Sequence, residues 1–194
     1  MPVQPEDRPA PTELELVRLF VNTREIDEEI ELLPSAAAST RWLRSKGLLG
    51  SRERLDEADF ARLIALREAL RAVLVAHAEN VEAPAAVARV NAEIGRVGLS
   101  PAFEDAHAAE IQSSGKGVDG AIARLLSISL QASYDGTWGR LKACPADHCH
   151  WAFYDASKNR SSRWCHMELC GAKQKRENFR RRHGDLSRSG KARA

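Results

Sequence analysis

Two short stretches decide the fold of the C-terminal quarter of the chain: CPADHC at residues 144–149 and CHMELC at residues 165–170. Each contains two cysteines separated by four residues, and 15 residues lie between the two stretches. Two close cysteine pairs joined by a loop of this length are typical of a structural zinc site, because each pair supplies two thiolates from a tight turn. We therefore predict one structural Zn²⁺, with four ligands: Cys144, Cys149, Cys165 and Cys170.

Four thiolates would fill every position of a tetrahedral ion and leave none for an activated water. His148, His150 and His166 lie next to the cysteines, so three cysteines with one histidine are an alternative ligand set. Free thiols or a redox pair are a second alternative. The zinc deaminases require His-x-Glu together with Pro-Cys-x-x-Cys, and this combination is absent because the chain has no Pro-Cys-x-x-Cys. We therefore expect a structural metal and no enzymatic activity.

Aromatic side chains lie between the two cysteine pairs. Trp151 and Phe153 alternate as on a short strand, and with Trp164 they are predicted to cover the cysteine cluster as a small core. Stacking on nucleic-acid bases is the alternative role for these rings.

Cations and hydroxyls are concentrated around the cysteines. A predicted turn before Cys165 carries basic residues interleaved with serines, which suits phosphate oxygens. After Cys170 a predicted helix places Lys173, Arg176 and Arg180 on one face. The candidate nucleic-acid-binding residues are Lys158, Asn159, Arg160, Arg163, Lys173, Lys175, Arg176 and Arg180.

Charge is distributed unevenly along the chain. Residues 1–138 hold 15 Lys/Arg and 22 Asp/Glu, a net charge of −7, whereas residues 139–194 hold 14 and 5, a net charge of +9. An acidic body with a basic end indicates a polyanionic partner for that end, and DNA is the partner we expect. No apolar run approaches the roughly 18 residues needed to cross a membrane. The N-terminal residues have no apolar signal-peptide core, so we expect a cytoplasmic protein with no membrane partner.

Residues 12–138 are predicted to form a mainly helical domain with a core of its own. Apolar residues recur at helical spacing, and residues 97–113 have the short, interrupted pattern of a weak β-hairpin. The long helix is expected to keep Arg62, Arg67, Glu68 and Arg71 mainly on its outer face. The predicted helices run from residue 12 to about 22, from 39 or 40 to 47, from 56 to 80, from 84 to 95 or 98, and from 119 to 134.

The remaining segments complete the predicted organisation. Residues 24–34 are acidic and expected to be irregular, residues 139–183 form the zinc module, and residues 1–11 and 184–194 are expected to be flexible tails. The N-terminal domain contains no Gly-x4-Gly-Lys-[Ser/Thr] phosphate loop, no Gly-x-Ser-x-Gly and no His-Glu-x-x-His. The sequence therefore identifies no catalytic or ligand-binding residues in it.

The zinc module resembles a known family. Its pattern is Cys144-x4-Cys149 followed by Asp155-x-Ser157-x-Asn159-x-Ser161-x-x-Trp164-Cys165-x-Met167-x-x-Cys170-Gly171, which is similar to the CGNR-type zinc finger of bacterial regulators. In that family the last cysteine begins Cys-Gly-Asn-Arg, whereas this chain has Ala172 and Lys173 after Gly171. Lys173 keeps the positive charge of the arginine but not its bidentate fork.

The first half resembles the ABATE domain that precedes this finger. The resemblance rests on Phe20-Val21-Asn22-Thr23 and on Trp42-Leu43 with Gly47-Leu48-Leu49. It implies an α+β N-terminal domain and a role as a stress-linked transcription regulator. Together the two resemblances cover nearly the whole chain.

These observations lead to one expected fold and two candidate functions. The fold class is α+β: a mainly helical N-terminal domain with a small β-hairpin, followed by a small treble-type zinc module that ends in a basic helix. We expect a bacterial transcription regulator that binds DNA through the zinc finger, while the N-terminal domain senses a small-molecule effector or binds a protein partner. The alternative is an interaction protein whose basic module docks on an acidic protein or on RNA.

Overall fold

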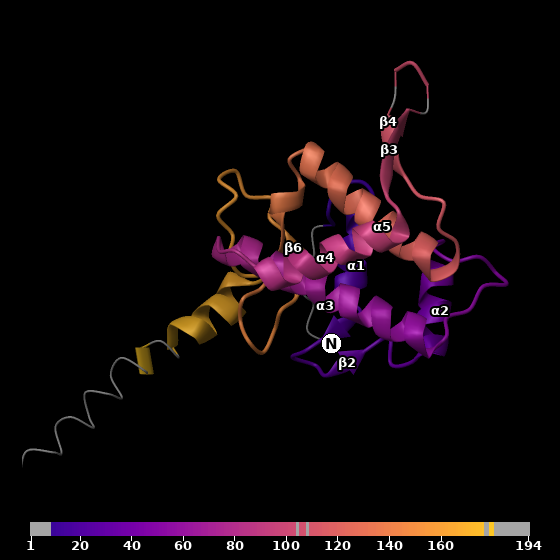
Figure 1. Ribbon diagram of the computed structural model, residues 1–194. Coiled ribbons are helices and arrows are strands. Elements are labelled where there is room, and N and C mark those ends of the chain that lie inside the picture. Colours follow the sequence, from indigo (N-terminus) through magenta and orange to yellow (C-terminus); the bar gives the residue numbers. More distant parts are fainter. Residues whose placement is uncertain (1–8, 104, 108, 177–178, 181–194) are drawn as a thin grey trace, which may run out of the picture.

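The computed structural model describes residues 9–103, 105–107, 109–176 and 179–180. The predicted tail residues 1–8 and 184–194 lie outside the described part, as do residues 181–183 of the predicted zinc module. The principal helices are α1 (Leu14–Val21), α2 (Ala36–Ser45), α3 (Glu57–Glu79), α4 (Pro84–Val97) and α5 (Gly117–Tyr134). Figure 1 shows them gathered into one body, from which the chain continues into the zinc module.

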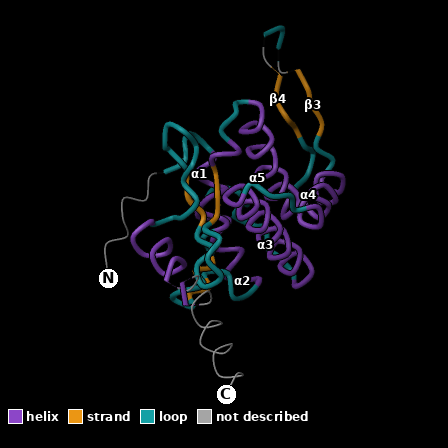
Figure 2. The backbone as a smooth tube through the Cα atoms, turned by 90° about the vertical axis from the view of Figure 1, so that its left-hand side faces the viewer, coloured by secondary structure: helices purple, strands orange, loops and turns teal. Residues whose placement is uncertain are grey.

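Short antiparallel hairpins connect the helices. The paired strands are β1 (Arg24–Glu25) with β2 (Ile30–Glu31), β3 (Ser100–Phe103) with β4 (Ala109–Gln112), and β5 (Leu141–Ala143) with β6 (Ala152–Tyr154). A 3₁₀ turn, η1 (Trp138–Arg140), leads into β5, and a π-helical turn, η2 (Met167–Gly171), leads into a helix that includes residues 172–176. The predicted α+β class is confirmed, with helices predominating (Figure 2).

Local signals set the ends of the longest helix. The Asp56 carboxylate accepts a hydrogen bond from the Asp59 backbone N–H, and the Asp59 carboxylate accepts one from the Asp56 N–H, which forms a capping box. Asn80 closes α3 in the left-handed conformation with φ 54°. Pro84 occupies the first turn of α4, and Gly98 ends it with φ 63°. These boundaries agree with the predicted ranges.

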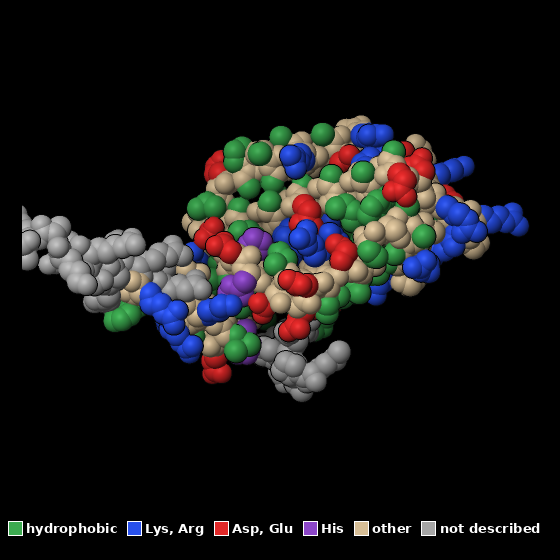
Figure 3. All heavy atoms as spheres, turned by 90° about the horizontal axis from the view of Figure 1, so that it is seen from below, with side chains coloured by type: hydrophobic (Ala, Val, Ile, Leu, Met, Phe, Trp, Pro, Cys, Tyr) green, Lys and Arg blue, Asp and Glu red, His purple; other side chains and the backbone are tan. Residues whose placement is uncertain are grey.

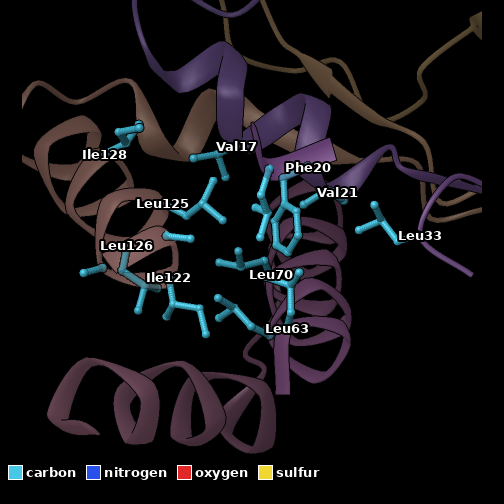
Figure 4. Packing of buried hydrophobic residues seen from close by; sticks show 14 of the residues in the cluster. Val17, Phe20, Val21, Leu33, Leu63, Leu70, Ile122, Leu125, Leu126 and Ile128 are labelled. Atoms are coloured by element: carbon cyan, nitrogen blue, oxygen red, sulfur yellow. The ribbon is translucent and has the colours of Figure 1, made fainter. Parts of the chain in front are cut away.

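The main core lies between α1, α3 and α5 (Figure 4). Phe20 from α1, Leu70 from α3 and Leu125 from α5 are each fully buried. Removing this apolar surface from water is the main stabilising contribution, on the order of 1.5–3 kcal/mol for each large side chain. Ala10 is also buried in this core, and its N–H donates to Glu15, although the sequence places it in the N-terminal tail.

Two elements differ from the sequence-based expectation, and a third agrees with it. Helix α2 begins at Ala36, before the predicted start, because the Ser35 hydroxyl accepts a hydrogen bond from the Ala38 N–H and caps the helix there. The stretch 24–34, expected to be irregular, contains the β1–β2 hairpin. The predicted hairpin at 97–113 is present as β3–β4 and projects from the body in both views (Figures 1 and 2).

Two arginines of α3 are inside the protein, so their predicted placement on the outer face is wrong. Arg67 is 1% exposed and Arg71 is 3% exposed. Both guanidinium groups bind Glu68, and Arg67 also binds both carboxylate oxygens of Glu31 at 2.7 and 2.8 Å. A buried guanidinium is tolerated only when it is paired and hydrogen-bonded in this way.

The hairpin β5–β6 belongs to the same core as the helices. Leu141, Ala143 and Ala152 are fully buried in the cluster formed by α1, α3 and α5. The core is therefore not confined to residues 1–138, and the division of charge near Trp138 does not coincide with a gap in packing. Over the described ranges, no helix is long and apolar enough to cross a membrane.

Candidate metal centre and basic surface

The β5–β6 hairpin forms the first half of the metal centre. Cys144 directly follows β5, and its N–H donates to the carbonyl of Trp151 at 2.9 Å, which extends the pairing of the two strands. The chain then reverses, because the Cys149 N–H donates to the Ala146 carbonyl at 2.8 Å and His150 takes a left-handed φ of 51°. Both sulfur atoms of the first pair are thus presented from one tight turn.

The second cysteine pair lies at the start of the C-terminal helical segment. Cys165 precedes η2 and Cys170 lies within it, and the Cys170 N–H donates to the His166 carbonyl at 3.0 Å. The four Sγ atoms lie within 4.8 Å of one another. Those of Cys149 and Cys165 are 3.5 Å apart, and those of Cys165 and Cys170 are 3.7 Å apart.

These distances fit a tetrahedral zinc site. A Zn–S bond of about 2.3 Å gives sulfur–sulfur edges of about 3.8 Å. Hydrogen bonds among the four sulfur atoms lower the pKa of the Cys144 thiol and raise the pKa of the Cys149 and Cys165 thiols. When bound, the ion would join four thiolates, and this complete set leaves it a structural role.

The histidines take other roles than metal ligation. The group able to hold a metal consists of cysteines alone among the described residues, which favours the all-cysteine set over the alternative with one histidine. His166 Nδ1 instead accepts a hydrogen bond from the Glu168 N–H at 3.2 Å and caps η2.

The three aromatic residues predicted to cover the cysteine cluster have different positions relative to it. Trp164 packs against the cysteine cluster, as predicted for a small core. Trp151 instead lines a hollow beside the cysteines, and Phe153 is buried on β6 outside the cysteine cluster. The prediction that all three rings cover the cluster is therefore wrong for Trp151 and Phe153.

A buried ion pair fixes the basic loop that joins the two cysteine pairs. Lys142 on β5 and Asp155 after β6 are both buried, and the Lys142 Nζ lies 2.7 Å from the Asp155 carboxylate. The same ammonium donates to the carbonyls of Arg160 and Ser162, so all three of its protons are used. Lys142 is not among the predicted site residues, and its only signal in the sequence is a lysine in an otherwise apolar strand.

Asp155 also organises the backbone of this loop. Its carboxylate accepts hydrogen bonds from the Ser157 and Ser162 N–H groups, both at 3.0 Å. Burial alone would raise the pKa of Asp155, but the hydrogen bonds from Lys142, Ser157 and Ser162 outweigh it and lower that pKa to about 2. Asp155 and Ser157 of the quoted pattern are therefore loop-building residues.

The loop and the helix expose all of the predicted nucleic-acid-binding residues, and most of them have no ion-pair partner among the described residues. Arg163 differs, because its guanidinium donates to Glu79 of α3 at 2.8 Å and lies 5.1 Å from the Trp164 ring centre. Arg163 is nevertheless exposed, as are Lys158, Asn159 and Arg160 on the loop and Lys173, Lys175, Arg176 and Arg180 on the helix. Loop and helix lie at the same end of the molecule (Figure 1).

Two side chains of the helical body, which comprises α1 to α5, hold the zinc module in place, and neither role is predicted from the sequence. The Asn22 amide donates to the Ala152 carbonyl at 2.8 Å and accepts from the Ala152 N–H at 2.7 Å, so it pairs with β6 as a strand would. Arg71 donates to the carbonyl of His150 and to that of Val21 at the end of α1. Asn22 belongs to the Phe20–Thr23 segment that carries the resemblance of the first half.

Comparison with models of protein families gives two matches. Residues 14–128, more than half of the chain, match the ABATE model, whose description is putative stress-induced transcription regulator. Residues 140–183 match the CGNR zinc finger. A search of curated proteins finds no match. Both predicted resemblances are confirmed, and the finger match together with the cysteine cluster supports one structural zinc.

Proposed function

The chain belongs to the ABATE family of putative stress-induced transcription regulators, and we propose that it acts as a regulator whose zinc finger binds duplex DNA. In this proposal the helical body receives the regulatory signal, from a small molecule or a partner protein. The zinc has no catalytic part, because four thiolates complete its coordination. The protein is accordingly proposed not to be an enzyme.

One observation carries the proposal. Six exposed cations at one end of the molecule have no ion-pair partner within the described ranges: Lys158, Arg160, Lys173, Lys175, Arg176 and Arg180. The helical part also exposes cations without an ion-pair partner among the described residues, including Arg52, Arg54 and Arg89, but residues 1–138 carry a net charge of −7, whereas residues 139–194 carry +9. Unpaired cations collected on one small module are the electrostatic footprint of a polyanion-binding surface.

The framework beneath these cations favours DNA over an unstructured contact. Lys142 and Asp155 fix the loop that carries Lys158 and Arg160. The metal ligand Cys170 lies in the turn that leads directly into the helix with Lys173 and Arg176. Cations held on rigid elements can match the regular spacing of the phosphates in duplex DNA. Cations on a flexible tail have no fixed spacing and would not favour duplex DNA in this way.

Titration of the zinc-loaded chain with random duplex DNA across a salt series tests this function. Four to six phosphate contacts predict a slope of about −4 to −5 for log affinity against log salt. Arg176→Ala should reduce the size of that slope by about one and weaken all sequences alike. The matched control is Arg124→Ala on the helical body, where an exposed arginine pairs with Glu13 and should leave the slope unchanged.

The outcome also decides between the two candidate functions. Absence of duplex binding even at low salt would overturn the proposal and leave docking on an acidic protein or on RNA as the function of the basic module. If Arg124→Ala and Arg176→Ala reduced the salt slope equally, binding would depend on the overall charge of the protein and not on the zinc module.

A further inference from the structure

A hollow lies between the zinc module and the β1–β2 hairpin. Its volume is about 350 Å³, within the range of roughly 300–1,000 Å³ that is common for small-molecule sites. One wall comes from the β1–β2 hairpin through Glu25 and Asp27, and the opposite wall comes from the C-terminal helix through Lys173 and Arg176. Seen from below, this face carries Lys and Arg, His, and Asp and Glu side chains close together (Figure 3).

The opposite charges on the two walls do not pair with each other. None of Glu25, Asp27, Lys173 and Arg176 takes part in an ion pair in the part of the chain that the structure describes. Burial and the neighbouring charges of Glu28 and Asp27 raise the pKa of Glu25, as expected for an acidic wall without a cation. A ligand that carries both charges could satisfy both walls at once.

Between the charged walls the lining is mixed, with apolar Trp151 and Leu169 beside three of the metal-ligating cysteines and the polar side chains of His148, His166 and Glu168. Trp151 is half-buried and contributes to the hollow beside the cysteines. Leu169 of η2 also lines it, although this side chain is 63% exposed. An indole ring and an exposed leucine in one concave site favour a ligand with an apolar or aromatic body.

We infer that this hollow binds a small zwitterion with an apolar body, of the chemical class of aromatic α-amino acids. The ligand's ammonium group would face Glu25 and Asp27, its carboxylate would face Lys173 and Arg176, and its ring would lie against Trp151. The inference deepens the regulatory part of the proposed function, because the ligand would connect the helical body to the helix that carries the DNA-binding cations.

Isothermal titration of the zinc-loaded full chain, without DNA, tests the site with three related probes. Tryptophan carries both charges, tryptamine lacks the carboxylate and indole-3-propionate lacks the ammonium group. We expect tryptophan to bind about tenfold or more tightly than either analogue, because each analogue leaves one charged wall without a partner. Equal binding of the three probes, or no binding of tryptophan at millimolar concentration, would overturn the inference.

A double variant assigns the charges to the walls. Glu25→Gln with Asp27→Asn should weaken tryptophan and tryptamine about tenfold and leave indole-3-propionate unchanged. The matched control, Glu57→Gln with Glu110→Gln, removes the same charge elsewhere and should change none of the three affinities. Thermal unfolding of each variant verifies that it is folded. The titrations contain no DNA, so a failure to bind tryptophan does not contradict the DNA-binding proposal. A failure to bind duplex DNA likewise does not contradict the ligand site.

Discussion

Lys142 and Asp155 form the ion pair on which the basic loop depends. Neither side chain reaches solvent, and each satisfies several further hydrogen bonds in the loop. Removing one partner of such a pair is costly, because the other charge remains buried without compensation. The pair therefore holds the loop in one conformation and so fixes the positions of Lys158 and Arg160.

The Lys142→Met substitution should destabilise the protein by about 3 kcal/mol, since it keeps the apolar stem but leaves the Asp155 carboxylate unpaired. Urea-induced unfolding of the zinc-loaded protein measures the change. The control is Arg124→Met, which removes an exposed pair with Glu13 and should change the free energy of unfolding by less than about 1 kcal/mol. Similar losses from both substitutions would show that the buried pair has no special structural role.

The low pKa of Asp155 predicts a dependence of stability on pH. The folded pKa is about 2, below the ordinary value of 3.8, so the carboxylate stabilises the fold above pH 4 and this contribution is lost as the pH falls from 4 towards 2. The shift corresponds to about 2 kcal/mol. The difference in stability between the wild type and Asp155→Asn should therefore shrink over this range. Release of zinc at low pH affects both proteins, so a constant difference down to pH 2 would contradict the assignment.

At the scale of elements, sequence periodicity predicts the helices well because they carry strong local signals. The capping box at Asp56 and the left-handed Asn80 delimit α3 without help from distant contacts. The β1–β2 hairpin was missed because its strands are only two residues long. Arg67 was placed outside because nothing local reveals a partner 36 residues away, Glu31.

The same difference between local signals and distant contacts applies to the candidate site. The cysteine spacing predicts the metal centre because all four ligands come from one short segment. The residues that attach this segment to the helical body, Asn22 and Arg71, could not be identified from spacing, because their partners lie 130 and 79 residues away. Local patterns report chemistry within an element, whereas contacts between elements depend on the whole fold.

Asn22→Ala should loosen the contact between α1 and β6. The substitution removes two hydrogen bonds and leaves the buried N–H and carbonyl of Ala152 without partners, at a cost of about 2–3 kcal/mol. Thermal unfolding measures the loss of stability. Hydrogen exchange should show that the loss of protection is located in β5–β6. Asn91→Ala on the exposed side of α4 is the matched control and should change stability by less than about 0.5 kcal/mol. Unchanged exchange in the hairpin of Asn22→Ala would contradict this role.

For the whole molecule, the shared core means that the zinc module and the helices do not fold independently. Leu141, Ala143 and Ala152 are buried among α1, α3 and α5, and the turn that joins β5 to β6 carries two metal ligands, Cys144 and Cys149. Metal binding by a small zinc module contributes about 10 kcal/mol or more to its folding. A change in the metal centre should therefore extend into the helical body through β5 and β6.

Removal of zinc by a strong chelator tests this coupling. We expect residues 144–171 to lose protection from hydrogen exchange, and we also expect partial loss in the part of α3 around Leu70 and Leu74, which belongs to the core shared with β5. Helix α2 lies at the opposite end of the molecule (Figure 1) and serves as an internal control that should keep its protection. Added zinc should restore the original pattern. If α3 kept full protection after chelation, the two halves would be independent, and the boundary near residue 138 that the charge distribution predicts would also be a boundary in stability.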